Sequence, residues 1–138
     1  MKTLRTTFVL AFSLLVMGVQ AQVLRVDVQI TDNDGNVAKI TAATTSAATG
    51  CNSPDFPVYR NGEKEQALLE DYKYISIMPY EPSSNETLYV VAELEKPDGS
   101  TEQVEMSKHL RFNGHAIEGE ASLMLKDISM IEVFVDEE

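Results

Sequence analysis

The sequence predicts an all-β protein of about eight short antiparallel strands, arranged as a two-sheet sandwich or a flattened barrel. Polar and apolar residues alternate in Arg25–Ile30, which is the period of a half-buried strand. Turn-forming clusters such as Asp32–Asn36 and Lys96–Ser100 separate the alternating segments. Short strands at intervals of roughly 8–12 residues with turns between them are typical of sandwiches and barrels.

The first 21 residues are expected to be a signal peptide. Lys2 and Arg5 give a positive start, and Phe8–Val19 is an uncharged apolar run. That run is about 12 residues long, whereas a helix that spans a bilayer needs roughly 20. Val19 and Ala21 fit the signal peptidase positions, so cleavage after Ala21 is predicted. Residues 22–138 would then form a single exported domain, periplasmic or secreted, with no transmembrane segment.

The first half of the mature chain should open with a hairpin over Val23–Thr44, because Gly35 can take a positive φ in the turn. Thr44–Pro57 lacks any period and is expected to be a long surface loop. The best helix candidate is Glu63–Asp71, which is short and has no good N-cap. Tyr72–Met78 is rich in β-branched and aromatic residues and is predicted to be a strand.

The second half should add several more strands. Thr87–Glu95 is a strong candidate, like Tyr72–Met78, and the polar loop Pro79–Glu86 precedes it. Asn-Gly is a strong hairpin signal, so Asn113–Gly114 is expected to close a tight hairpin between Leu110–Phe112 and His115–Ile117. Two further strands are predicted, over Ser122–Leu125 and Met130–Val135.

The alternation also predicts which side chains form the core. Residues of one parity in each strand should share the buried face. The expected core residues are Val26, Val28, Ile30, Ile75, Ile77, Leu88, Val90, Leu94, Leu123, Leu125, Ile131 and Val133.

Four landmarks recur in the same order in residues 23–79 and 88–135, which suggests two related halves. Common turn motifs could produce the same coincidence, so both interpretations stay open. The strongest match joins Asp71 to Asp127 and Ile75 to Ile131 at a constant spacing of 56 positions. The other paired landmarks are Asp34-Gly35 with Asp98-Gly99, Asn61-Gly62 with Asn113-Gly114, and Leu68-Leu69 with Met124-Leu125.

The net charge of the chain limits which kinds of molecule are expected to bind it. The chain has 11 Lys and Arg against 22 Asp and Glu, a formal net charge of −11. Loss of Lys2 and Arg5 with the signal peptide would take this to −13. Nucleic acids and anionic membranes both need basic residues on the protein, so neither is an expected partner.

Few residues are candidates for chemistry, and no cofactor is predicted. Asp32, Asp34 and Asn36 place oxygen atoms at alternate positions, as calcium loops do, although an Asx-rich turn explains the same pattern. His109 and His115 could approach each other across the predicted hairpin as zinc ligands, or be solvated surface residues.

Cys51 is the chain's single cysteine, which rules out an internal disulfide. It could be a passive thiol, pair between two chains, or act as a nucleophile if a base lay beside it. No Gly-rich phosphate loop or nucleophile elbow is present, and the chain has no Trp to stack on sugar rings.

Tyr80 is the candidate contact residue, because it lies in a two-proline loop where an aromatic ring has no core to pack against. The alternative is that Tyr80 folds back as a lid on the edge of the sheet. The sequence therefore favours a non-catalytic binding or accessory module at the cell envelope or outside the cell, with a protein or glycan ligand. The alternatives are a small secreted hydrolase and an assembly subunit that uses edge-strand addition. An oligomer could form through Cys51 or through such an edge.

Overall fold

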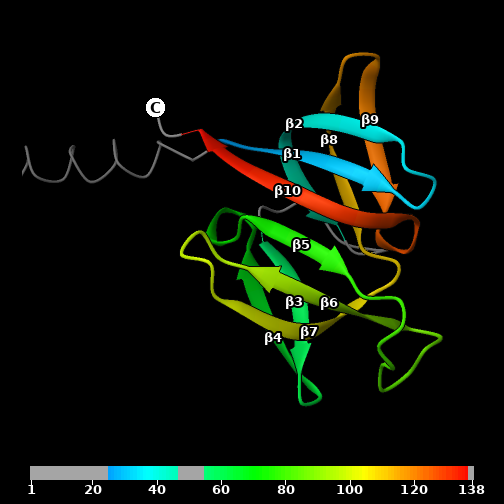
Figure 1. The fold of residues 1–138 in the computed structure, drawn as a ribbon. Coiled ribbons are helices and arrows are strands. Elements are labelled where there is room, and N and C mark those ends of the chain that lie inside the picture. Colours follow the sequence, from blue (N-terminus) through cyan, green and yellow to red (C-terminus); the bar gives the residue numbers. More distant parts are fainter. Residues whose placement is uncertain (1–24, 47–54, 137–138) are drawn as a thin grey trace, which may run out of the picture.

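The computed structural model describes residues 25–46 and 55–136, which form one antiparallel sheet that curls into a half-barrel (Figure 1). Two 3-10 turns, η1 (Leu69–Asp71) and η2 (Leu125–Asp127), interrupt the strands. The ten strands are β1 (Arg25–Asp32), β2 (Val37–Ser46), β3 (Asp55–Arg60), β4 (Glu63–Leu68), β5 (Tyr74–Ile77), β6 (Tyr89–Glu95), β7 (Thr101–Ser107), β8 (Arg111–Ala116), β9 (Gly119–Met124) and β10 (Ile128–Asp136). The all-β prediction is confirmed, whereas a sandwich of two sheets is not.

The sheet has the same arrangement when it is traversed from either edge. Its order is β4-β3-β7-β6-β5-β10-β1-β2-β8-β9. Each of the strands β1–β5 has a counterpart whose label is five higher, among β6–β10. When every strand is replaced by its counterpart, the list becomes the same order read from the opposite edge. The β5–β10 pair lies at the centre, and β4 and β9 are the two edges. The strand order is therefore equivalent in the two halves of the chain.

The residue registers obey the same relation. Val28 faces Ile40 in the first hairpin, and Ala92 faces Val104 in the second, 64 positions later in both strands. Two of the strand pairings that join the halves also correspond. β2 meets β8 at Thr41 and His115, and β7 meets β3 at Glu105 and Tyr59. Each half thus extends a hairpin, β3–β4 or β8–β9, onto the sheet of the other half.

The core lies on the inner face of the curled sheet. Equivalent positions in the two halves are buried alike: Phe56 and Phe112 are both fully buried, as are Leu69 and Leu125. Most of the predicted core is confirmed, with Ile77, Val90 and Leu123 packed against it but only partly buried. Buried residues that the alternation did not single out include Ile40, Phe56, Val58, Leu69, Tyr72, Val104, Met106, Leu110, Phe112 and Ile128.

Two predictions for the first half are wrong. Glu63–Asp71 is not a helix: residues 63–68 form β4, and the 3-10 turn follows. The two-residue turn Asn61–Gly62 has positive φ at both positions, which suits a tight hairpin and pairs β4 along the whole of β3. Thr44–Pro57 is not a loop throughout, because β2 runs to Ser46 and β3 begins at Asp55.

The Asn113–Gly114 hairpin is also wrong. Both residues lie inside β8, where they face Ser122 and Ala121, and the turn falls at Ile117–Glu118. Gly114 is needed for another reason. A Cβ atom there would lie 2.3 Å from Ile40 Cγ2 and 2.7 Å from the Thr41 carbonyl oxygen. The glycine therefore allows β8 to approach β2 closely, beside a bulge at which Ala42 has a positive φ.

Leu88 is the one predicted core residue that is exposed, with 45% of its surface accessible. It precedes the first residue of β6, where the backbone still follows the loop turn closed by Asn85. The predicted signal peptide and Cys51 lie outside the described residues. Within the described residues, no helix has the length and apolar character required to cross a membrane.

Candidate binding surface

The connection between β5 and β6, residues 78–88, holds Tyr80 away from the sheet. We call it the Tyr80 loop. The Glu81 N–H donates to the Met78 carbonyl at 3.2 Å, which closes a turn with Pro79 at its second position. Proline presets the backbone there, so Tyr80 takes the next position of the turn. Its side chain is 97% exposed.

Hydrogen bonds order the rest of the Tyr80 loop. The Asn85 carbonyl accepts from the N–H groups of Leu88 and Tyr89 at 3.1 and 2.8 Å, and the Asn85 side chain accepts from Thr87 N–H at 3.0 Å. The Ser83 hydroxyl donates to the Tyr89 carbonyl at 3.0 Å. The middle of the loop, at Ser83 and Asn85, is therefore tied to the start of β6.

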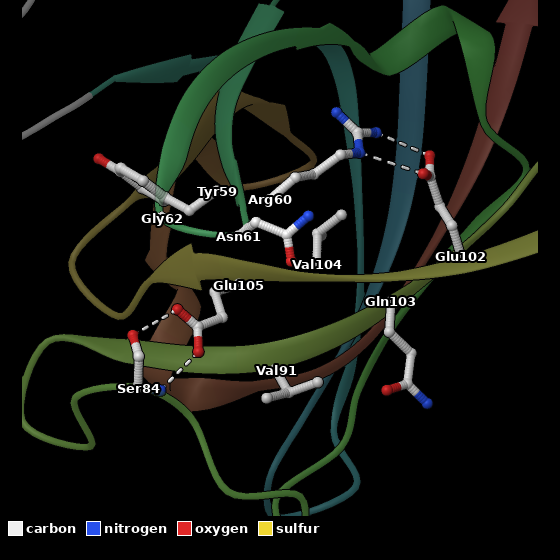
Figure 2. A pocket seen from close by; sticks show the side chains of 10 residues that line it. All are labelled: Tyr59, Arg60, Asn61, Gly62, Ser84, Val91, Glu102, Gln103, Val104 and Glu105. Carbon is white, nitrogen blue, oxygen red and sulfur yellow. Dashed lines mark hydrogen bonds and ion pairs between the residues drawn. The ribbon is translucent and has the colours of Figure 1, made fainter.

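Ser84 fastens the loop to the outer face of β7. Its backbone N–H and its hydroxyl both donate to the carboxylate of Glu105, at 2.5 and 2.7 Å. Glu105 is also the residue of β7 that faces Tyr59 on β3. Figure 2 shows this pair of bonds at one wall of a groove.

The groove has a volume of about 500 Å³, and we call it the β7 groove. It lies where β3 and β7 diverge after their single pairing position, Tyr59 with Glu105. The adjoining surface is aromatic: the rings of Tyr59 and Tyr89 lie 4.8 Å apart at an angle of 49°. The groove is lined by Tyr59, Arg60, Asn61, Gly62, Ser84, Val91, Glu102, Gln103, Val104 and Glu105.

Arg60 and Glu102 also line the groove, and Figure 2 shows this pair on the other side of the β7 ribbon from Glu105. Nε and Nη2 of Arg60 donate to the two Glu102 oxygens at 3.2 and 2.8 Å, and a third nitrogen bonds Glu65. The Tyr72 hydroxyl donates to Glu102 at 3.2 Å. The Arg60 guanidinium lowers the pKa of Glu102, while burial and the Glu102 charge raise the pKa of Tyr72.

The carboxylates of the β7 groove are bonded to other groups of the protein. Glu102 is held ionised by Arg60, so it is a poor general acid near neutral pH. Glu105 accepts two bonds from Ser84 and braces the loop. Among the groove-lining residues there is no His, Lys or Cys that could serve as a base or nucleophile beside Ser84. The side-chain amides of Asn61 and Gln103 also line the groove.

A second hollow of about 520 Å³ lies at the β2–β8 connection, beside the Ala42 bulge. Asn113 donates to the Ser46 hydroxyl at 2.9 Å and accepts from Ser122 at 2.7 Å. The predicted ligand His115 lines this hollow next to Glu120, its cross-strand neighbour. These polar groups mainly bond one another across three strands.

The structure does not bring His109 and His115 together. His109 lies in the turn before β8 and His115 lies near the end of that strand, which separates them by most of its length at about 3.3 Å per residue. The expected approach depended on a hairpin at Asn113–Gly114 that does not exist. Within residues 25–46 and 55–136, no group of three or more His, Cys, Asp or Glu side chains could hold a metal ion.

Asp32, Asp34 and Asn36 form an Asx-type turn at the end of β1. One Asp32 oxygen accepts from the N–H groups of Asp34 and Asn36 at 2.9 and 2.8 Å, and the other accepts from the Asn36 amide at 3.3 Å. The Asn36 N–H bond is the main cause of the lowered pKa of Asp32. The Asp32 oxygens therefore close the turn.

Pairs such as Arg60 with Glu102 and Ser84 with Glu105 were not found from the sequence, because 42 and 21 positions separate their members. No local pattern connects residues at those distances. The comparisons with known proteins add no relative: no family model matches the chain, and no curated protein matches it.

Proposed function

We propose that this protein is an exported, non-catalytic binding or accessory module that acts at the cell envelope or outside the cell. Its contact surface is the Tyr80 loop together with the adjoining β7 groove. The expected signal peptide and the acidic net charge support the location and the choice of a partner other than nucleic acid.

The observation that carries the proposal is a fully exposed tyrosine on an ordered loop. Tyr80 is 97% exposed, and the loop beneath it is fixed by the bonds of Ser83, Ser84 and Asn85. Ordering a loop opposes binding when it must happen on contact, and here the folded protein has already ordered it. A tyrosine offers a large apolar ring and a hydroxyl with little side-chain entropy to lose.

The β7 groove supports a protein or glycan partner. Tyr59 supplies aromatic surface, and the amides of Asn61 and Gln103 can both donate and accept hydrogen bonds. Such a mixed lining suits hydroxyl-rich sugars and peptide backbones alike. A small hydrolase remains the alternative, and the internal bonding of Glu102 and Glu105 favours binding over it.

The test uses the exported protein against two defined probes, a glycan array and a displayed random-peptide library. We expect selected ligands to bind at least about tenfold more weakly to Tyr80→Ala, because that substitution removes the central contact. Ile117→Ala is the matched control, since Ile117 is 101% exposed at the tip of the β8–β9 hairpin. It should leave binding unchanged.

Two outcomes would contradict the proposal. Ligands that bind equally well to Tyr80→Ala would place the contact surface elsewhere. Turnover of chromogenic ester, glycoside or phosphate substrates that Glu105→Gln abolishes would favour the hydrolase.

A further inference from the structure

The two edge strands occupy equivalent places in the sheet but differ in how they are protected. β4 and β9 each have one neighbouring strand, and they lie at opposite ends of the half-barrel (Figure 1). Gln66 in the middle of β4 corresponds to Ser122 in the middle of β9, 56 positions later. An open edge presents unpaired backbone groups to other strands, so proteins usually shield it with charge.

β4 is shielded. Glu63, Lys64 and Glu65 are all exposed and follow one another along the strand. Glu65 belongs to the same face as buried Ala67 and bonds Arg60, which makes it an inward-pointing charge on an edge. Both ends of β4 also carry acids, with Glu70 and Asp71 following the strand. Two copies of this edge would repel each other.

β9 lacks this shielding. Its residues are Gly119-Glu120-Ala121-Ser122-Leu123-Met124, with one charged side chain and no proline. Ala121 and Leu123 are partly buried and continue the apolar inner face to the edge itself. A strand laid beside β9 would cover these two side chains and extend the core.

The backbone of β9 offers its free groups at alternate residues. The Leu125 N–H donates to the Leu110 carbonyl at 2.7 Å, so odd-numbered residues of this ladder bond to β8. In an antiparallel pair the intervening residues point their N–H and C=O groups the other way. Glu120, Ser122 and Met124 therefore direct theirs to the open side.

Charge is self-complementary along this edge. Glu118 and Glu120 lie at the start of β9, whereas Lys126 follows its end and Arg111 faces Met124 from β8. Asp127 is the opposing acid at the basic end. The ion pairs found among the described residues involve Arg25 and Arg60, and Arg111 instead donates to the Ser122 hydroxyl at 3.1 Å. An antiparallel copy of β9 would bring the acidic end against the basic end.

We propose that β9 is the interface with a second copy of this chain, paired antiparallel with Ser122 opposite Ser122 of the second copy. This register pairs all the outward backbone groups, because it sets Glu120 against Met124 of the second copy. Any shift leaves some of them unpaired. On the inner face it sets Ala121 against Leu123, a small side chain against a large one. On the outer face, Arg111 and Met124 of one copy lie in one row with Glu120 of the second copy.

Sedimentation of the exported protein over a range of concentrations tests the interface. We expect a rise to twice the monomer mass, and loss of that dimer in Ser122→Pro, which removes an outward N–H group. Gln66→Pro is the matched control, because it occupies the equivalent position on β4 and also lies on the open side of its ladder. It should dimerise as the native protein does.

Charge reversal tests the register. Arg111→Glu and Glu120→Arg should each raise the dissociation constant about tenfold, since each removes both symmetric ion pairs. The double variant should restore dimerisation. If Ser122→Pro fails to fold, as judged by circular dichroism, the three charge variants still test whether β9 forms the interface.

A native protein that stays monomeric at every concentration would overturn the proposal and leave β9 to the strand of a different protein. Dimerisation that survives Ser122→Pro but not Gln66→Pro would overturn it as well. Failure of the double variant to restore the dimer would overturn the register. None of these results bears on Tyr80, which lies in the other half of the sheet.

Discussion

Ile75 and Ile131 face each other across the central β5–β10 pair, at the point around which the ten strands repeat. Both side chains are fully buried. The neighbouring pairs are equivalent as well. Tyr74 faces Glu132, and at a spacing of 56 positions this corresponds to Met130 facing Ser76. The two residues that matched at a spacing of 56 positions thus lie opposite each other at the centre of the sheet.

Ile131→Ala should lower the free energy of unfolding by roughly 2–5 kcal/mol, because it leaves a cavity at the centre of the core. Ile75→Ala should cost a similar amount, since the two positions are equivalent. Reversible urea denaturation measures both. Met130→Ala, on the same strand with 39% of its side chain exposed, is the control and should cost far less. A loss well under 1 kcal/mol for Ile131→Ala would contradict the assignment of this position to the core.

Asp71 and Asp127 lie in like elements, as relatedness of the halves predicts. Each is the last residue of a 3-10 turn. Relatedness would also have each Asp side chain accept a hydrogen bond from a backbone N–H of its turn, and neither side chain makes such a bond within the described residues. The backbone closes both turns instead, through N–H bonds from Tyr72 to Leu69 and from Ile128 to Leu125. Common ancestry of the halves stays a prediction.

The Arg60–Glu102 pair should make stability depend on acid pH. The pKa of Glu102 is lowered in the folded protein, chiefly by its hydrogen bond with Arg60. Its contribution is therefore present above the ordinary glutamate value of 4.5 and is lost as the pH falls through the lower folded value. Glu102→Gln should cost about 1 kcal/mol at pH 7, a modest figure because the pair is partly solvated.

Denaturation midpoints at several pH values between neutral and strongly acid check this expectation. The difference between Glu102→Gln and the native protein should shrink as the acid limit is approached. Glu86→Gln, at an exposed position between β5 and β6, is the control and should follow the native curve. A constant difference at all pH values would mean that packing, and not ionisation, explains the loss.

Local sequence patterns predicted the turns and the buried positions of strands, because both depend on residues that are neighbours in the chain. The Asp34-Gly35 and Asp98-Gly99 turns lie between paired strands, and the alternation located most of the core. Long-range contacts decided the rest. Residues 63–68 suit a helix by propensity, but pairing with β3 makes them a strand. The Arg60, Glu102 and Ser84 contacts join distant parts of the chain, and nothing in the local sequence marks them.

Processing after Ala21 remains a prediction. The exported protein should begin at Gln22, because Ala21 is the best small residue after the apolar run. N-terminal sequencing and intact mass measure this directly. Replacing Ala21 with a bulky residue should slow cleavage, whereas the same change at Gln22 should not. Recovery of Met1 on the exported protein would contradict the prediction.

Gly114→Ala should strongly destabilise the protein, although its Asn-Gly context suggests an ordinary turn. An added Cβ would lie 2.3 Å from Ile40 Cγ2 and 2.7 Å from the Thr41 carbonyl oxygen, and the second of these is backbone that cannot rotate away. We expect a loss of about 3 kcal/mol, as for an overpacked core position. The matched control is Gly62→Ala, because Gly62 has a φ of 83° and no atom within 4 Å of an added Cβ. That change should cost only about 1 kcal/mol, from the left-handed backbone alone. Chemical denaturation of the two variants compares steric crowding with backbone strain. If Gly114→Ala proved no worse than Gly62→Ala, β8 would not approach β2 as closely as the structure shows, and the bulge at Ala42 would need another explanation.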